Sequence, residues 1–156
     1  MRGHKLNMAC RCAPDSDVVG VGILIRDSMG RVAAALETTV VGCGDMVQVH
    51  ATAIGTALQF PFDIGLRNLV VEVCCQELLR LIQMGTPCGA SCGVLVDDIC
   101  WWIPLFNALG FSFIPKLCNK ASIALAAEAL SSGSIQVWLD DQLDCVTSFV
   151  QVDLAQ

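Results

Sequence analysis

Alternating apolar and small positions near the N-terminus predict two adjacent strands. Within residues 19–25 every odd position is branched and apolar, while Gly20 and Gly22 lie on the opposite side. This two-residue period is typical of a β-strand. Residues 27–30 then place aspartate first and glycine last in a type I turn, where the aspartate side chain can bond the turn backbone. The pattern predicts a hairpin over residues 18–41.

The apolar period lengthens after Asp45, where it becomes helical. Apolar side chains recur three or four residues apart at Val47, Ala51, Ile54 and Leu58. This spacing predicts a helix packed on the sheet, with Asp45 as its N-terminal cap. Pro61 is expected to kink or shorten its last turn, and Gly65 to end it. The apolar run over residues 68–74 then predicts a buried strand parallel to an earlier one.

The remaining segments complete an alternation of strands and helices. We expect a first strand over 5–12, helices over 76–84, 94–109 (containing Pro104) and 119–130, and a fifth strand over 111–115. This order predicts an α/β fold in three layers, a mixed five-stranded sheet with helices on both faces. The length of 156 residues fits one domain. We place it at residues 1–134, followed by an acidic C-terminal tail at 135–156.

Composition excludes several classes of protein. Hydrophobic residues make up 54% of the chain and charged residues 15%, which disfavours disorder. Apolar runs are too short to span a membrane, and the N-terminus lacks a signal-peptide pattern, so we expect a soluble intracellular protein, in the nucleus or the cytoplasm, without a membrane partner. The net charge is −6. A strongly basic surface for tight nucleic-acid binding is therefore not expected.

Ten cysteines raise the question of disulfides or a metal site. Without a secretory signal, they are best interpreted as reduced thiols. Their spacing lacks the paired pattern of a zinc ribbon, and the chain has only two histidines, His4 and His50. The sequence predicts no metal site.

Five segments carry a resemblance to a known family, in the family's order and close to its spacing. They are residues 5–7, 20–32, 57–73, 114–130 and 137–141, reading KLN, GVGILIRDSMGRV, ALQFPFDIGLRNLVVEV, IPKLCNKASIALAAEAL and VWLDD. In these segments the chain resembles the ribonuclease H type 1 domain, in its reverse-transcriptase-like plant branch. The resemblance implies the ribonuclease H-like fold. It also implies hydrolysis of RNA–DNA hybrids by two magnesium ions held on four carboxylates.

The four carboxylate positions implied by the resemblance hold other residues here. They are Ala9, His50, Cys74 and Ile123, and a shift of one residue at any of them restores no acid. Glu72 lies on the same strand face as Cys74, but one carboxylate cannot seat two magnesium ions. Glu72 can instead be interpreted as an exposed or ion-paired strand residue with no role in a site. We therefore expect a degenerate active site and no cofactor, with magnesium required only if the family activity were retained.

Lys116, Asn119 and Lys120 are the candidate nucleic-acid-binding residues. They cluster at the start of the last predicted helix, where positive charge and backbone amides favour a phosphate. The alternative is an ordinary solvated helix end. His50 has two interpretations as well. It could form a residual thiol or metal site with Cys74, or it could be a partly buried histidine that makes one hydrogen bond. We favour the second.

Two pairs of residues have a binding and a packing interpretation. Gly20 and Gly22 leave one strand face bare, which suits a nucleic-acid backbone or, as we favour, a closely packed helix or strand. Trp101 and Trp102 are adjacent, so we expect one to face the core and the other an edge or solvent.

Three functions remain open on the sequence. The first, which we favour, is a catalytically inactive ribonuclease H-like domain that weakly binds nucleic acid, an RNA–DNA hybrid or RNA, or a protein. The second is an active RNA–DNA hybrid endoribonuclease, as the resemblance implies. The third is a protein-interaction module that uses the acidic tail at 135–156, or a retroelement-derived remnant. Fold does not decide among them.

Overall fold

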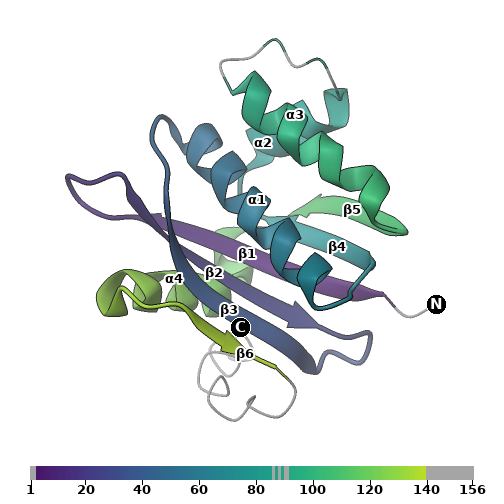
Figure 1. Cartoon of the computed structure of the whole chain (residues 1–156), viewed down its shortest axis with the longest axis horizontal. Helices are drawn as coiled ribbons and strands as arrows, with labels where there is room; N and C mark the ends of the chain where they lie inside the picture. The colour runs from purple at the N-terminus through teal and green to yellow at the C-terminus, as the bar shows by residue number, and fades with distance from the viewer. Residues whose placement is uncertain (1–2, 86, 88, 90–91, 140–156) are drawn as a thin grey trace.

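A six-stranded sheet forms the centre of the molecule. The computed structural model describes residues 3–85, 87, 89 and 92–139. The strands are β1 (His4–Cys12), β2 (Val18–Arg26), β3 (Val32–Val41), β4 (Asn68–Val73), β5 (Ala108–Phe113) and β6 (Gln136–Trp138). They lie in the order β5-β4-β1-β2-β3-β6 (Figure 1). β1, β2, β3 and β6 pair antiparallel, while β4 and β5 run parallel to β1. The predicted mixed sheet is confirmed, with six strands in place of five.

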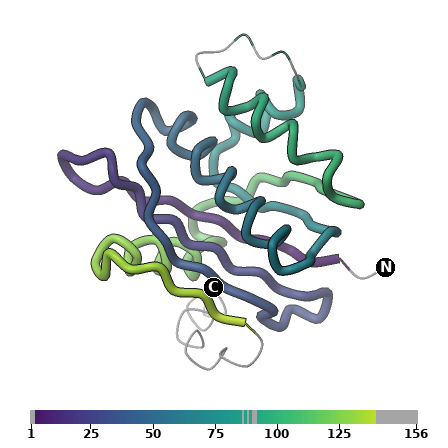
Figure 2. Tube along the Cα trace, viewed as in Figure 1, coloured from purple at the N-terminus to yellow at the C-terminus, as the bar shows by residue number. Residues whose placement is uncertain are grey.

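Helices cover both faces of this sheet, as predicted. They are α1 (Met46–Asp63), α2 (Gln76–Met84), α3 (Gly93–Trp102) and α4 (Lys120–Ser132), with short 3₁₀ turns η1 (Ile103–Leu105) and η2 (Lys116–Cys118). α1, α2 and α3 lie on one face, and α4 lies on the other (Figures 1 and 2). The α2 bounds match the predicted helix, and the three-layer α/β architecture is confirmed. No helix in the described part of the chain is long and apolar enough to cross a bilayer.

The β2–β3 turn forms through the predicted aspartate and glycine. The Gly30 amide donates to the Asp27 carbonyl at 3.0 Å, and the Met29 amide donates to Asp27 Oδ1 at 2.9 Å. Gly30 has a φ of 80°, which a residue with a Cβ adopts only at a cost. These bonds fix the register of the hairpin.

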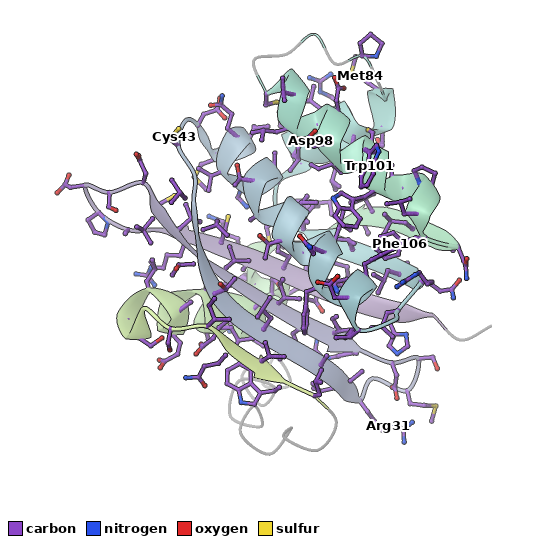
Figure 3. The ribbon with its side chains drawn as sticks, viewed as in Figure 1. Arg31, Cys43, Met84, Asp98, Trp101 and Phe106 are labelled. Atoms are coloured by element: carbon purple, nitrogen blue, oxygen red, sulfur yellow. The ribbon has the colours of Figure 1, made fainter. Side chains whose placement is uncertain are left out.

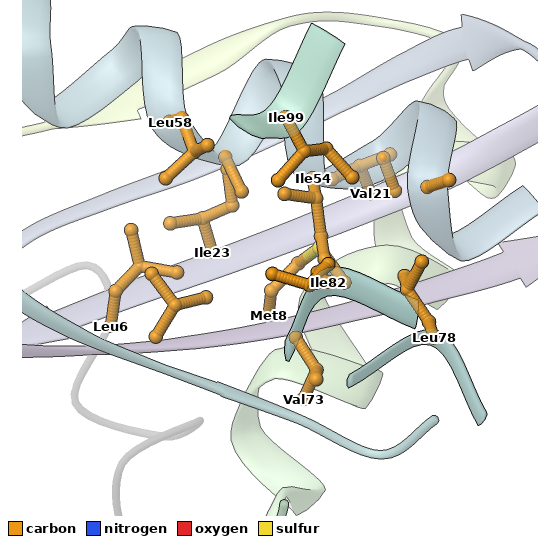
Figure 4. Close-up of a cluster of buried hydrophobic side chains, with 14 of the residues drawn as sticks. Leu6, Met8, Val21, Ile23, Ile54, Leu58, Val73, Leu78, Ile82 and Ile99 are labelled. Atoms are coloured by element: carbon orange, nitrogen blue, oxygen red, sulfur yellow. The ribbon is translucent and has the colours of Figure 1, made fainter. Parts of the chain in front are cut away.

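The two faces of β2 differ in the size of their side chains, and this decides what packs on each. Val21 and Ile23 contribute to the main core with residues of α1, α2 and α3 (Figure 4). On the other face, a Cβ added to Gly22 would meet the Ser122 carbonyl oxygen and, at 2.6 Å, the Ala126 backbone nitrogen. The glycines let the backbone of α4 approach the sheet closely, so the packing interpretation of Gly20 and Gly22 is confirmed.

The boundaries around α3 and β5 differ from the prediction. The helix expected over 94–109 ends at Trp102, because Pro104 has no N–H for the helical ladder and its ring crowds the preceding turn. β5 therefore begins at Ala108, which pairs with Asn68, instead of at residue 111. Pro61 was expected to kink or shorten the last turn of α1; the helix continues two residues past it, to Asp63, and the kink stays a prediction.

The sixth strand lies in the segment expected to be an acidic tail. Residues 136–138 form β6 and pair with β3, with Trp138 opposite Ala35. The Trp138 ring is buried in a small cluster with Leu24 and Leu125 on the α4 side of the sheet. The acidic residues of the tail, from position 140 onward, lie outside the described residues.

Candidate functional site

The side chain of Asn119 joins the segments that carry two of the implied carboxylate positions, Ala9 and Cys74. This amide, at the N-terminus of α4, donates from Nδ2 to the Met8 carbonyl at 2.8 Å and lies 3.4 Å from Cys74 Sγ. Met8 precedes Ala9 on β1. The backbone carbonyl of Asn119 accepts from the backbone N–H of Ile123 at 3.1 Å. We call the place defined by Ala9, His50, Cys74 and Ile123 the vacated site.

His50 lies on α1 and is buried, with 7% of its surface exposed. Its Nδ1 is 2.7 Å from the Met46 carbonyl oxygen. Because a carbonyl only accepts, Nδ1 carries the ring proton. Burial lowers the pKa of His50, and the charge of Lys116 lowers this pKa further, against the effect of the Met46 hydrogen bond. The ring is therefore neutral at neutral pH, and the interpretation of a histidine with one hydrogen bond is confirmed.

The thiols at the vacated site are protonated. Burial raises the pKa of Cys74, although the hydrogen bond from Asn119 and the charge of Lys116 oppose the rise. Burial, together with neighbouring thiols, raises the pKa of Cys10 to about 12. A thiol acts as a nucleophile or metal ligand only as the thiolate. Neither group is activated for that chemistry at neutral pH.

Magnesium does not fit this set of residues. Mg²⁺ takes carboxylate, carbonyl and water oxygens in octahedral geometry. The vacated site instead has a methyl group, an imidazole, a thiol and a branched alkyl chain. It also has one buried amide oxygen, Asn119 Oδ1, that has no hydrogen-bond partner among the residues the structure describes. Among the described residues, no three His, Cys, Asp or Glu side chains lie close enough to hold a metal ion.

Glu72 is engaged away from the vacated site. Its Oε1 accepts from Asn7 Nδ2 at 2.9 Å, and its Oε2 lies 3.6 Å from Lys5 Nζ. Asn7 Oδ1 in turn accepts from Arg26 Nη1 at 2.9 Å. The ion-paired interpretation of Glu72 is confirmed.

The Glu72 network lines a cleft of about 620 Å³ beside the start of β1. This group of residues was not predicted from the sequence. The alternating polar side chains Lys5 and Asn7 of β1 could have indicated it, because Glu72 of β4 lies opposite Asn7 in the parallel register.

The candidate binding residues separate into two kinds. Lys116 and Lys120 are exposed at the start of α4. The charge of Lys116 lowers the pKa of Cys10, His50 and Cys74 alike, which places it beside the vacated site.

Asn119, in contrast, is 0% exposed. Its amide is occupied in holding β1 and β4, so it cannot present its side chain to a surface ligand. Asn119 was predicted to contact nucleic acid; its burial makes it a structural residue instead.

Comparisons with known proteins identify the family. The model of the reverse transcriptase-like family matches residues 7–129. Because this covers most of the chain, the protein belongs to the reverse transcriptase-like family. No curated protein shows significant similarity to the sequence.

Solved structures of ribonucleases H have the same fold. The RNase H1 of the halophilic archaeon Halobacterium salinarum NRC-1 is 15% identical, with a TM-score of 0.73 over 83% of this chain and 98% of that chain. LC11-RNase H1, isolated from compost by a metagenomic approach and solved with an RNA/DNA hybrid, is 17% identical, with a TM-score of 0.71 over 83% of this chain and 98% of that chain. The domain is thus ribonuclease H-like in fold.

Proposed function

We propose that this chain is a non-catalytic ribonuclease H-like domain that binds nucleic acid weakly beside the vacated site. One observation carries the proposal. The four positions at which the resemblance implies carboxylates hold Ala9, His50, Cys74 and Ile123, while Lys116 adds a positive charge that acts on His50 and Cys74.

This exchange of charge favours a phosphate over a metal ion. A neutral imidazole and a neutral thiol give a divalent cation no charge to bind, and the Lys116 ammonium repels it. The same ammonium attracts a phosphate oxygen directly. Lys120, one turn further along the chain and also exposed, extends the positive patch.

The size of this patch supports weak binding. Two lysines displace few counterions from a nucleic acid, and the net charge of −6 opposes close approach of a polyanion. An RNA–DNA hybrid is the ligand to test, since LC11-RNase H1, which shares the fold, was solved in complex with one.

The test measures cleavage and binding separately. A labelled RNA–DNA hybrid is incubated with the purified chain in magnesium and then in manganese, with a Glu72→Gln variant alongside. We expect no cleavage by either protein. Retention of the hybrid is then measured against salt concentration for the wild type, for a Lys116→Ala/Lys120→Ala variant, and for Arg80→Gln as a control on α2.

The expected binding result is a salt-sensitive affinity that the double lysine variant weakens. Each lost phosphate contact should reduce the slope of log affinity against log salt by about 1. Arg80→Gln should leave this slope unchanged, since Arg80 pairs with Glu77 on the other side of the sheet. Cleavage by the wild type that Glu72→Gln abolishes would contradict the non-catalytic assignment. Retention unchanged by the double variant would contradict the lysine patch.

The acidic tail at 135–156 as a site for a protein partner stays a prediction.

A further inference from the structure

A second surface feature lies on the opposite side of the sheet from α4, between α1 and α3. A groove of about 410 Å³ separates these helices. It is lined by Thr52, Gly55, Thr56 and Gln59 of α1 and by Asp98, Trp101 and Trp102 of α3. The α1 residues recur at helical spacing, so they form one continuous stripe. Figure 3 shows Asp98 and Trp101 along α3. We call this feature the α1–α3 groove.

Trp101 presents an open aromatic face to this groove. Its side chain is 63% exposed. Its position is fixed by an edge-to-face contact with Trp102, at 5.5 Å between ring centroids, and Trp102 in turn contacts Phe62 at 5.5 Å. A tryptophan held in place and left uncovered is the kind of side chain that dominates the binding energy of interfaces.

The floor of the groove is open because of Gly55. A Cβ added there would meet no atom within 4 Å. A glycine in a helix interior makes the helix less stable than an alanine would, by about 1 kcal/mol. Since a Cβ would fit at position 55, packing within the described residues does not require a glycine there. Its effect is to leave room for an occupant.

The charge of the groove selects the class of occupant. α1 and α3 carry Asp63, Asp97 and Asp98 and no lysine or arginine. Asp98 is exposed at the groove itself. An exposed carboxylate repels a phosphate backbone and attracts a positively charged group.

We propose that the α1–α3 groove binds a basic peptide segment of a partner protein, with one arginine or lysine side chain over the Trp101 ring and against the Asp98 carboxylate. A cation over an indole face is a favourable contact, and the carboxylate adds a charge-assisted hydrogen bond. The same aromatic row already holds such a contact at its other end, where the Arg67 guanidinium lies 3.7 Å from the Phe62 ring centroid. Gln59, exposed on α1, can bond the peptide backbone.

This proposal is independent of the nucleic-acid patch. Lys116 and Lys120 lie at the start of α4, on the other face of the sheet. Each surface can therefore be altered without the other.

The ligand side of the test uses three labelled eight-residue peptides that differ only at one central position. This position holds arginine, its uncharged isostere citrulline, or glutamate. Binding to the full chain is followed by fluorescence polarisation and by the change in tryptophan emission. We expect the citrulline peptide to bind about tenfold more weakly than the arginine peptide, and the glutamate peptide not to bind.

The protein side uses substitutions that leave the fold intact. Gly55→Leu fills the groove and suits a helix, since leucine has a high helix propensity. Trp101→Ala and Asp98→Asn each remove one contact of the cation. Each variant should weaken the arginine peptide about tenfold, whereas Met29→Ala, an exposed residue of the β2–β3 turn, should leave its affinity unchanged. A cooperative thermal unfolding transition, at or above the wild-type midpoint for Gly55→Leu, verifies that each variant is folded.

Three results would overturn the proposal. The first is equal affinity for the arginine and citrulline peptides. The second is a concentration-dependent dimer that Gly55→Leu and Trp101→Ala abolish, which would assign the groove to a second copy of this chain. The third is loss of RNA–DNA hybrid retention in Trp101→Ala, which would assign it to nucleic acid.

Discussion

At the scale of single residues, Asn119 holds the vacated site in shape. Its Nδ2 joins the Met8 carbonyl of β1 to Cys74, the residue after β4, while its Oδ1 is buried with no hydrogen-bond partner in the described part of the chain. A buried acceptor left unpaired costs about 1–3 kcal/mol. The chain tolerates this cost because the same amide fixes the start of α4 against two strands. The geometry of the site is thus maintained without its carboxylates.

Glu37 is a second buried polar residue, and it makes stability depend on pH. Its side chain is 1% exposed, and Oε2 has no hydrogen-bond partner among the described residues. Burial and the charge of Glu128 raise the pKa of Glu37. The folded protein therefore binds this proton more tightly than the unfolded chain. Its contribution to stability must fall as pH rises from the ordinary glutamate pKa through the raised one, and it stays low above that.

We predict that Glu37→Gln stabilises the protein at neutral pH by about 1 kcal/mol, because it removes the buried charge and keeps the shape. The gain should shrink as pH falls through the raised pKa and disappear at about pH 3, below the ordinary glutamate pKa, where the wild-type carboxyl is protonated in both states. Thermal unfolding across this pH range measures both. Glu128→Gln, at an exposed position, is the matched control and should change stability by only a few tenths of a kcal/mol. A variant less stable than the wild type at neutral pH would contradict the prediction.

At the scale of elements, two glycines, Gly22 and Gly55, have opposite roles. Gly22 lies where α4 crosses β2, and its added Cβ would meet backbone atoms of Ser122 and Ala126 that cannot move without shifting the helix. Gly55 lies in α1 facing open space. One glycine is required by packing and the other is not.

We therefore predict opposite effects for two identical substitutions. Gly22→Ala should destabilise the protein by about 1–3 kcal/mol, because α4 must move off the sheet. Gly55→Ala should stabilise it by up to about 1 kcal/mol through helix propensity alone. Urea unfolding gives both values as shifts in midpoint at constant slope. Equal effects of the two substitutions would show that α4 does not approach β2 as closely as the structure has it.

Local signals in the sequence predicted the elements whose ends they mark. The turn at Asp27 and Gly30, the cap at Asp45 and the whole of α2 are confirmed. The helix expected over 94–109 was wrong because apolar residues continue past Pro104. The prediction followed this apolar run, although a proline inside a helix is the stronger signal and ends it. β6 was missed because a three-residue strand has no period of its own, and its stability comes from the burial of Trp138 on the α4 side of the sheet.

The candidate site was predictable only in part, for a related reason. The identity of the four vacated positions followed from the resemblance to ribonuclease H. The burial of Asn119 did not, because it depends on a carbonyl 111 residues earlier in the chain. The network of Lys5, Asn7 and Glu72 likewise depends on the parallel register of β1 and β4. Contacts of this kind join residues far apart in the chain. They depend on how the strands and helices are arranged in the fold, which a local sequence pattern does not predict.

At the scale of the whole molecule, the four positions at which the resemblance implies carboxylates come from four distant segments. β1 supplies Ala9, α1 supplies His50, the residue after β4 is Cys74, and α4 supplies Ile123. The bond from Asn119 Nδ2 to the Met8 carbonyl, the bond from Ser122 Oγ to the Asn7 carbonyl and the buried sheet hold β1 and α4 together without any carboxylate among the four residues. If the scaffold alone sets the geometry, carboxylates placed at the four positions should again converge.

We predict that the variant Ala9→Asp/His50→Glu/Cys74→Asp/Ile123→Asp is less stable than the wild type in chelator and regains stability in magnesium. Carboxylates brought together repel one another, and those at the buried positions 9 and 50 also lose solvation. A bound cation removes this repulsion, and at one hundred times its dissociation constant it stabilises the folded state by about 2.7 kcal/mol. The wild type should show no such shift, since its residues do not fit magnesium. The double variant Ala9→Asp/Cys74→Asp, with less repulsion, tests the same idea if the full variant fails to fold. Magnesium that stabilises the wild type as much as the variants would mean that the ion binds elsewhere, and the convergence of these four positions would have to be abandoned.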